Sequence, residues 1–191
     1  MNEVLKSLLI NFSLKYGLSP DRESIKRQLS KMNGMYSDQK AYEHLIKDDP
    51  LIYEFYDCGI LEKESSIAFG TSIIYPGKVG NEYFMTKGHY HNIMDTAEVY
   101  YCLSGCGYMM METMRGNWET QKMIPGTAVY VPGNFAHRSI NTSDSEPLVT
   151  FFAFRGDAGH DYGTIESKGF RKLIVEKAGQ PEIIDNPKWG N

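Results

Sequence analysis

From Leu51 onward the chain consists of short apolar or alternating runs separated by turn signals, and this pattern constrains the fold more than any other feature. The runs are residues 52–57, 67–75, 97–103, 107–113, 118–124, 127–132, 137–142 and 148–154. Dipeptides such as Pro76-Gly77 and Pro125-Gly126 stand between them. Short strands with turn signals every ~8–12 residues are typical of an all-β sandwich or barrel. The gaps are too short for the crossover helices of a parallel sheet, which disfavours an α/β fold.

The first part of the chain has a different pattern. Apolar residues recur at helical spacing near the N-terminus (Val4, Leu5, Leu8 and Leu9), and residues 24–32 and 37–47 continue the pattern. Ser37 is the predicted N-cap of the last helix and Pro50 its stop. We therefore predict an N-terminal helical extension over residues 1–50 and a β-barrel with a C-terminal tail over residues 51–191. The tail is predicted to add a strand pair at residues 172–176 and 182–184.

Composition excludes several classes of protein. The formal net charge of the 191 residues is -4, and lysine and arginine form no cluster, so we expect no nucleic-acid partner. No run of ~18 apolar residues predicts a membrane span. The three cysteines, Cys58, Cys102 and Cys106, form no C-x-x-C motif and are expected to be free thiols in a reducing compartment. These features together predict a cytoplasmic protein.

Three histidines and one glutamate form a candidate metal site. Residues two apart on a strand point the same way, so His89 and His91 are expected on one face. Glu98 begins the next strand and His137 heads another. Three imidazoles and one carboxylate suit a divalent first-row metal and leave open positions for substrate oxygens. An H-x-H pair supported by a carboxylate and a third histidine favours a metal site over isolated surface or core histidines.

Two stretches resemble the paired motifs of the cupin superfamily. Residues 89–105 carry H-x-H, a glutamate and a glycine, and residues 126–141 carry glycine, proline, histidine and asparagine at cupin spacing. Asn134 occupies a turn position where cupins carry glycine, and asparagine tolerates positive φ better than most residues. Six residues separate His91 from Glu98, more than in typical cupins. The resemblance implies a cupin fold, a double-stranded β-helix or jelly-roll-like barrel.

The longer gap, and several further segments in the same order, resemble the cupin-type glucose-6-phosphate isomerases. These segments are residues 71–91, 97–110, 125–141, 157–170 and 185–189. The resemblance implies interconversion of glucose 6-phosphate and fructose 6-phosphate in a homodimer. It implies one divalent ion per subunit, Fe(II) first, with Mn(II), Ni(II) or Zn(II) as alternatives. A metal chelated by both sugar oxygens would stabilise a cis-enediolate, with Glu98 as a shifting ligand or a nearby base. A direct hydride shift stays open.

The remaining site predictions concern substrate contacts. Several residues before His89 could donate hydrogen bonds to a phosphate through a hydroxyl, an ammonium or a backbone N–H group. These donors are Thr71, Ser72, Thr86, Lys87 and Gly88. Strand propensity alone also explains the threonines and the serine. In the family the 159–163 segment lies over the site, which implies that His160 and Tyr162 position sugar hydroxyls or shuttle protons. A hydrogen-bonded turn is the alternative. Tyr53 and Tyr100 are pocket candidates, and Arg155 is expected to replace a phosphate contact that related sequences make with tyrosine.

Other functions remain open for a metal-binding cupin. A related phosphosugar isomerase, such as one acting on mannose 6-phosphate, would use the same donors. An iron-dependent cupin dioxygenase would bind Fe(II) and oxygen with them. A non-enzymatic cupin would bind a sugar phosphate without converting it.

Overall fold

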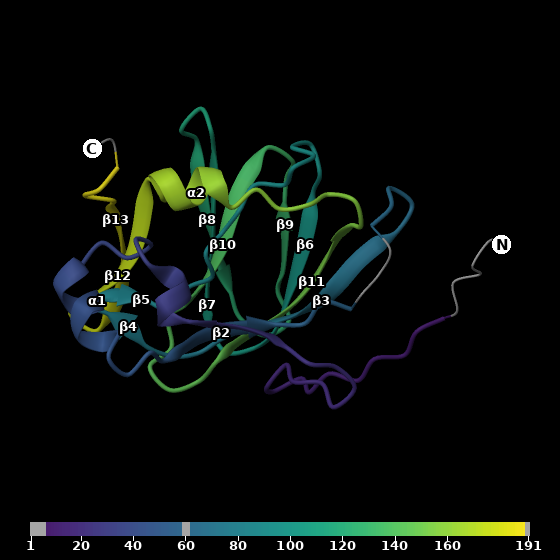
Figure 1. Cartoon of the computed structure of the whole chain (residues 1–191), viewed down its shortest axis with the longest axis horizontal. Coiled ribbons are helices and arrows are strands. Elements are labelled where there is room, and N and C mark those ends of the chain that lie inside the picture. Colours follow the sequence, from purple (N-terminus) through teal and green to yellow (C-terminus); the bar gives the residue numbers. More distant parts are fainter. Residues whose placement is uncertain (1–6, 59–61, 190–191) are drawn as a thin grey trace.

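A computed structural model describes residues 7–58 and 62–189 of the chain, and these form an antiparallel β-structure (Figure 1). The first sheet has the order β1-β2-β3-β11-β6-β9. Its strands are β1 (Ile25–Gln28), β2 (Leu51–Phe55), β3 (Ile67–Ile74), β11 (Leu148–Arg155), β6 (Glu98–Ser104) and β9 (Ala128–Val131). Every pairing in this sheet is antiparallel. The prediction of an all-β fold is confirmed.

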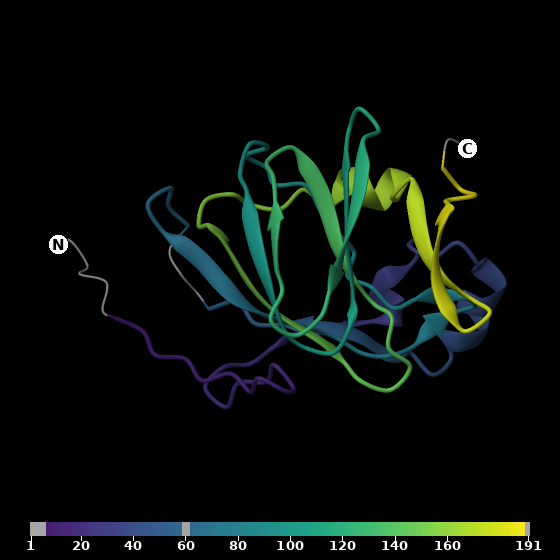
Figure 2. The same ribbon diagram turned by 180° about the vertical axis from the view of Figure 1, so that it is seen from behind.

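The second layer is built around the order β10-β7-β8. These strands are β10 (Phe135–Asn141), β7 (Gly107–Thr113) and β8 (Trp118–Met123). Isolated bridges, Met85 to Ile140 and His89 to His137, add residues 85–89 to the free edge of β10. The two layers enclose the barrel that the cupin resemblance implies, and Figure 2 shows them from behind.

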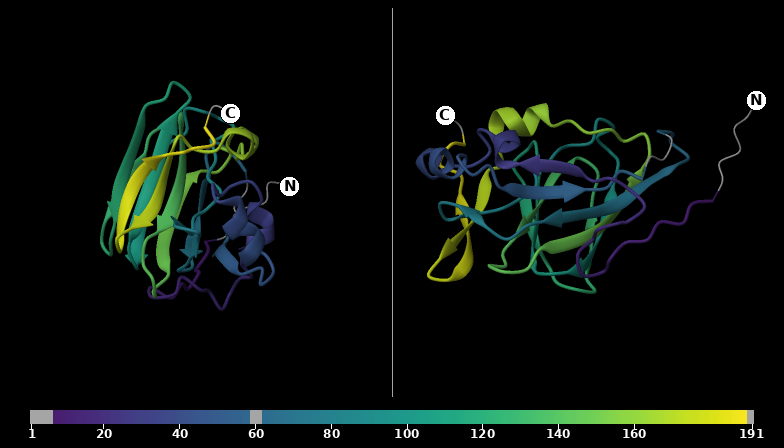
Figure 3. Two further views of the ribbon diagram at one scale, coloured as in Figure 1. Left: turned by 90° about the vertical axis from the view of Figure 1, so that its left-hand side faces the viewer. Right: turned by 60° about the horizontal axis from the view of Figure 1, so that its bottom comes forward.

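A small third sheet closes one end of the molecule. Its order is β13-β12-β5-β4, formed by β13 (Gln180–Asp185), β12 (Lys172–Lys177), β5 (Glu82–Tyr83) and β4 (Lys78–Val79). The two tail strands are therefore present where predicted. Helix α1 (Gln39–Leu45) lies beside this sheet, and α2 (Gly163–Lys168) crosses the edge of the barrel (Figure 3). Within the described ranges neither helix has the length and apolar composition needed to cross a bilayer.

The prediction of a helical N-terminal extension is only partly correct. The last predicted helix exists as α1, although Asp38 rather than Ser37 caps it, by accepting the Ala41 N–H at 3.0 Å. Residues 24–32 are not helical: they form β1 and the 3₁₀ turn η1 (Leu29–Met32). The open edge of β2 pairs with β1, and these tertiary hydrogen bonds override the local helical preference.

The described part of the first predicted helix is not helical. Leu8 and Leu9 lie in an extended segment and are exposed, while Val4 and Leu5 fall outside the described residues. This segment instead covers part of the outer face of the first sheet, where a Cβ on Gly17 would lie 2.7 Å from Ile73 and Val149 side-chain carbons. The division of the chain at residue 50 stays a prediction.

The core lies between the two main layers. It includes Leu29, Ile52 and Ile74 from the N-terminal side and Met109 and Met110 from β7, all with no exposed surface. The methionine run therefore serves packing, as unbranched side chains that fill irregular gaps. One side of the barrel interior stays open, and polar side chains such as Ser72, Glu98 and His137 face it.

Candidate metal centre and substrate cavity

The four predicted ligands converge from separate elements. His89 and His137 lie opposite each other in a two-hydrogen-bond bridge, with N···O distances of 3.3 and 3.1 Å. His91 is two residues further along the same extended segment, and Glu98 is the first residue of β6. Their ligand atoms all lie within 4.8 Å of one another. Strand alternation and long-range pairing thus bring three imidazoles and one carboxylate to one point.

The distances around Glu98 fit a shared cation. Glu98 Oε2 lies 2.8 Å from His137 Nε2, 3.1 Å from His91 Nε2 and 4.0 Å from His89 Nε2. The His89 Nε2 atom is buried and has no hydrogen-bond partner among the described residues. Metal–ligand bonds of ~2.0–2.2 Å place neighbouring ligand atoms about 3 Å apart, so this group could hold a metal ion. A bound ion would explain why the buried His89 Nε2 has no hydrogen-bond partner in the described part of the chain.

The electrostatics of the group favour the protonation states that bind a metal ion, an ionised Glu98 and a neutral His89. Burial by itself would raise the pKa of Glu98, but His137 and His91 outweigh this and hold the pKa below its usual range. Burial, with the neighbouring His137 and His160, lowers the pKa of His89 well below normal. Metal ligands must be ionised carboxylates and neutral imidazoles. Glu98 and His89 are therefore both in the form that binds a cation near neutral pH.

A cavity of about 200 Å³ opens onto His89, Glu98 and His137, while His91 lies behind its lining. It is lined by β2, β3, β6, β10 and β11 and by the segment after β11. Among the predicted site residues, the lining includes Tyr53, Ser72, Thr86, Lys87, Gly88, His89, Glu98, Tyr100, His137, His160 and Tyr162. Most of the predicted substrate contacts thus share one cavity with the candidate ligands.

The segment between β11 and α2 covers the site. Backbone hydrogen bonds join Tyr90 and Asp161, at 3.1 and 2.7 Å, and hold the segment beside the ligands. The His160 ring centroid lies 4.3 Å from that of His89, and the Tyr162 ring centroid lies 5.6 Å from it. Burial lowers the pKa of His160 and raises the pKa of Tyr162. Near neutral pH they present an uncharged imidazole and a protonated hydroxyl to the cavity.

Several donors lie at the cavity wall. The Thr86 hydroxyl oxygen accepts the Ser139 N–H at 3.1 Å, which leaves its O–H free to donate into the cavity. Burial raises the pKa of Tyr53 to about 12, so this phenol also stays a donor. Burial and Glu98 raise the pKa of Tyr100 well above its usual range. Lys87 forms an ion pair with Glu166 of α2, which ties the cavity wall to the covering segment.

Two predicted substrate residues do not reach the cavity. Thr71 neighbours Ser72 on β3, and alternation turns it to the opposite face, where its hydroxyl donates to the Gly17 carbonyl at 2.8 Å. Arg155 forms an ion pair with Asp157 at 2.6 Å and is absent from the lining. The predictions for Thr71 and Arg155 are corrected on these grounds.

Other residues of the lining were missed by the sequence analysis. Ser139 lies two positions after His137 on the same strand, so the period of two could have identified it. Phe152 and Phe154 line the apolar side, and Phe154 pairs with Glu98 across β11 and β6. Asp57 comes from the chain after β2. Nothing local marks Asp57 or Phe152 as cavity residues, because only the folding of β2 and β11 around the ligands brings them there.

The chain is similar to known proteins along most of its length. The family model of glucose-6-phosphate isomerase (GPI) matches residues 26–189. A protein named glucose-6-phosphate isomerase from Pyrococcus abyssi is 48% identical over 174 residues, covering 91% of this chain and 92% of its own. Another of that name from Thermococcus onnurineus is 45% identical over 180 residues, covering 94% and 95%. Among solved structures, a Bacillus subtilis oxalate decarboxylase aligns with 55% of this chain and 25% of its own, at 28% identity and a TM-score of 0.43.

Proposed function

The chain belongs to the glucose-6-phosphate isomerase family, and we propose that it interconverts glucose 6-phosphate and fructose 6-phosphate at a metal centre held by its four convergent ligands. The observation that carries the proposal is the meeting of His89, His91, Glu98 and His137 at one point, where all but His91 line one cavity. Aldose–ketose conversion needs a group that stabilises negative charge on two adjacent sugar oxygens, and such a site suits that need.

The ligand set supports a divalent first-row metal. Three imidazole nitrogens and one carboxylate oxygen accept Fe(II), which we propose as the ion, with Mn(II), Ni(II) and Zn(II) as alternatives. When bound, such an ion acts as a Lewis acid toward the sugar oxygens. Phe135 O lies 3.4 Å from His137 Nδ1 and would hold that imidazole with its other nitrogen toward the ion.

The chain's own residues supply the proton chemistry. Glu98 is an ionised carboxylate at the cavity wall, suited to take a proton from the carbon next to the sugar carbonyl. The neutral imidazole of His160 can accept a proton from a sugar hydroxyl, and the Tyr162 hydroxyl can donate one. A direct hydride shift between the two carbons would leave Glu98 as a ligand only. Both routes fit the same geometry.

A coupled assay for fructose 6-phosphate conversion tests this function. Turnover of fructose 6-phosphate with a purified chain, and no consumption of oxygen, is the expected result. Oxygen uptake would indicate the dioxygenase, and tight sugar-phosphate binding without turnover would indicate the non-enzymatic cupin. Mannose 6-phosphate in the same assay tests the related isomerase. In deuterium oxide, solvent deuterium in the product indicates proton transfer, and its absence indicates the hydride shift.

The phosphate group is proposed to bind Ser72, Thr86 and the Gly88 backbone, with Lys87 nearby. We expect Thr86→Val to raise KM for the sugar phosphate about 10-fold while kcat changes little, because a hydrogen bond to a charged group contributes ~1.5–3 kcal/mol. Steady-state kinetics measures this. Thr71→Val is the matched control. Like Thr86→Val it removes a hydroxyl group, but Thr71 lies in β3 and its hydroxyl faces away from the cavity. Equal KM changes in the two variants would contradict the assignment.

The outer face of the first sheet supports the proposed homodimer. Val99 and Tyr101 of β6 and Tyr130 of β9 point outward and are 42%, 43% and 64% exposed. Val99 pairs with Tyr130, so the aromatic and aliphatic surfaces adjoin. The described N-terminal segment packs on this sheet near Ile73 and Val149, and the Ser104 hydroxyl at the end of β6 donates to the Lys15 carbonyl oxygen. An apolar patch of this kind can be buried against a second copy of the chain.

We expect the unmodified chain to sediment at twice its mass of 21.7 kDa, and Tyr101→Asp with Tyr130→Asp to sediment as a monomer. Two carboxylates buried without partners in the interface would each cost several kcal/mol. Gln121→Asp, on exposed β8 of the other layer, adds one negative charge elsewhere and should stay a dimer. A monomeric unmodified chain would refute the dimer without affecting the proposed chemistry.

A further inference from the structure

Arg138 is the largest side chain that is almost fully buried, at 2% exposure, and it stands next to a candidate metal ligand. His137 and Ser139 of β10 face the cavity, and Arg138 between them faces the opposite way, outside the cavity lining. Burying a guanidinium is costly, and replacing a whole buried ion pair by apolar residues is often neutral or stabilising. Stability alone is therefore a poor explanation for an arginine at this position.

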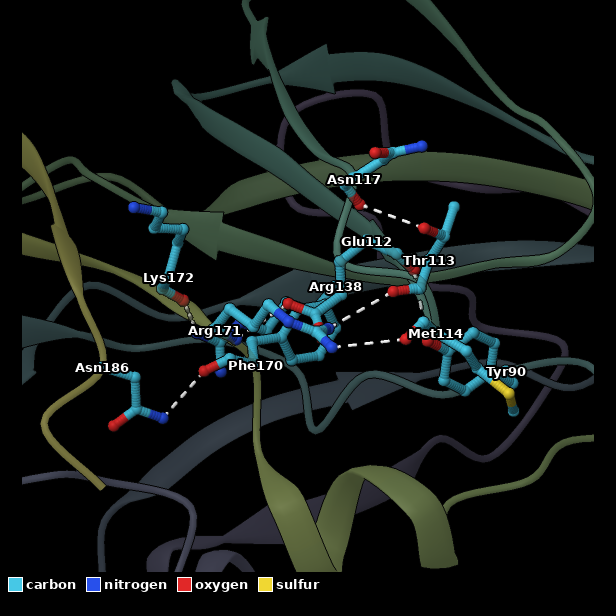
Figure 4. A network of polar contacts seen from close by, with 10 residues as sticks. All are labelled: Tyr90, Glu112, Thr113, Met114, Asn117, Arg138, Phe170, Arg171, Lys172 and Asn186. Carbon is cyan, nitrogen blue, oxygen red and sulfur yellow. Dashed lines mark hydrogen bonds and ion pairs between the residues drawn. The ribbon is translucent and has the colours of Figure 1, made fainter. Parts of the chain in front are cut away.

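The guanidinium joins three parts of the fold (Figure 4). It lies 4.4 Å from the ring centroid of Phe170, in the segment after α2. Its Nη2 donates to the Lys172 carbonyl oxygen of β12 at 3.2 Å, and lies 3.8 Å from the Met110 sulfur of β7. A planar guanidinium can stack on a ring and donate in its own plane at the same time, which an ammonium cannot.

The same pair of side chains fixes the residue before His89. Gly88 has φ +78°, and a Cβ there would lie 2.7 Å from a Phe170 ring carbon and 3.0 Å from Arg138 Cβ. The backbone of Gly88 thus packs flat against Arg138 and Phe170. The next residue, His89, is hydrogen-bonded to His137 across the bridge. Gly88 therefore packs on the Phe170 ring, which the Arg138 guanidinium stacks against, and His137 adjoins Arg138 in sequence.

A buried carboxylate compensates the charge of Arg138. Glu82 of β5 is 2% exposed, and its Oε2 accepts the Ser37 N–H and hydroxyl at 2.9 and 3.0 Å. Glu82 Oε1 and Arg138 Nε are both buried, and neither has a hydrogen-bond partner among the described residues. Glu82 also interacts favourably with the Arg138 guanidinium through their opposite charges. A positive charge at this position is thus compatible with the fold, and a lysine there would keep the compensation.

We propose that Arg138 is a positioning residue of the metal centre, which fixes the backbones of His137 and of Gly88–His89 so that their imidazoles converge. The inference rests on the metal site of the proposed function. Arg138 touches neither the cavity nor the ligand atoms, and acts through Phe170 and the two backbones. Replacing the planar guanidinium of Arg138 should therefore weaken metal binding and lower the stability of the fold.

The neighbouring network offers a matched control. Arg171 stacks on Trp189 at 4.2 Å and donates to the Thr113 and Met114 carbonyl oxygens, each at 3.3 Å. It resembles Arg138 in its contacts, and lies in the same network in Figure 4, but it packs against neither Gly88 nor β10 in any contact described. We compare Arg138→Lys and Phe170→Leu with Arg171→Lys and Trp189→Leu.

Titration of each purified chain with Co(II), followed by its d–d absorption, measures the metal dissociation constant independently of turnover. We expect Arg138→Lys and Phe170→Leu to raise the Kd about 10- to 100-fold, as loss of outer support around metal ligands does, and to alter the absorption band. Arg171→Lys and Trp189→Leu should leave both unchanged. Thermal unfolding of all four variants reports the purely structural contribution.

The outcomes separate the two proposals. An unchanged Kd in Arg138→Lys, with a loss of thermal stability like that of Arg171→Lys, would overturn the positioning role. Where Arg138→Lys does not fold, Phe170→Leu decides the question, because it removes the ring and leaves the buried charge. An unmodified chain that binds no Co(II) would overturn the metal site itself, and with it this inference.

Discussion

Incubation with a strong chelator should reduce kcat/KM for fructose 6-phosphate by at least ~10³-fold, or about 4 kcal/mol of transition-state stabilisation. Without a cation the group around Glu98 has no centre that can hold both sugar oxygens. The carboxylate would remain in close contact with His137 and His91, at 2.8 and 3.1 Å, and so would be less available to the substrate. The coupled fructose 6-phosphate assay, before and after chelation and removal of the chelator, measures the loss.

Reconstitution provides the control for chelation. Fe(II), Mn(II), Ni(II) and Zn(II) are expected to restore activity to different degrees, because imidazole-rich sites accept borderline first-row ions. Mg(II) and Ca(II) prefer oxygen ligands and should restore little. Restoration by calcium alone, or full activity in metal-free protein, would mean that the three histidines and Glu98 are not a metal centre.

The Glu98→Gln variant should lose turnover almost completely, with kcat falling about 10³-fold, within the range of 10²–10⁴ typical of a lost acid–base group. Glutamine keeps the shape of the side chain and removes its negative charge. That charge serves in either role, as a ligand to the ion or as the base at the sugar carbon. Steady-state kinetics on the metal-loaded variant measures the loss.

Glu112→Gln is the matched control for this substitution. Glu112 is equally buried, at 2% exposure, and its carboxylate pairs with Arg171 at 3.1 Å outside the substrate cavity. The control should lose stability, because a buried ion pair is broken, but keep kcat and KM. Comparable losses of kcat in both variants would show that any buried charge is needed for the fold, and the role of Glu98 would have to be abandoned.

The candidate ligands were predictable from the sequence because the H-x-H pair depends on local geometry and because Glu98 and His137 stand at the ligand positions of the cupin motifs. An H-x-H pair on an extended chain puts both imidazoles on one face whatever surrounds it. Asn134 was expected to hold a glycine-like turn, and its φ is +68°. Strands β6 and β9 also alternate in burial; in β6, Glu98, Tyr100 and Cys102 turn inward while Val99 and Tyr101 turn outward.

Substrate contacts were harder to predict because a strand presents two faces and the sequence does not label them. Thr71 and Ser72 are chemically alike, and only the register of β3 between β2 and β11 places Ser72 in the cavity and Thr71 under the N-terminal segment. The same holds at the end of β11, where Arg155 turns to Asp157. A shift of one residue in register would exchange the faces.

By itself, the sequence determined the all-β class, the positions of most strands from β6 onward, and the four candidate ligands, because these depend on side-chain periodicity and spacing along the chain. Only the tertiary structure decided that residues 25–28 form a strand, which threonine faces the cavity, and that Arg138 lies beneath Gly88 and beside Phe170. Those outcomes depend on hydrogen bonds and packing between residues far apart in sequence. A local pattern carries no information about which distant edge or ring will be its partner.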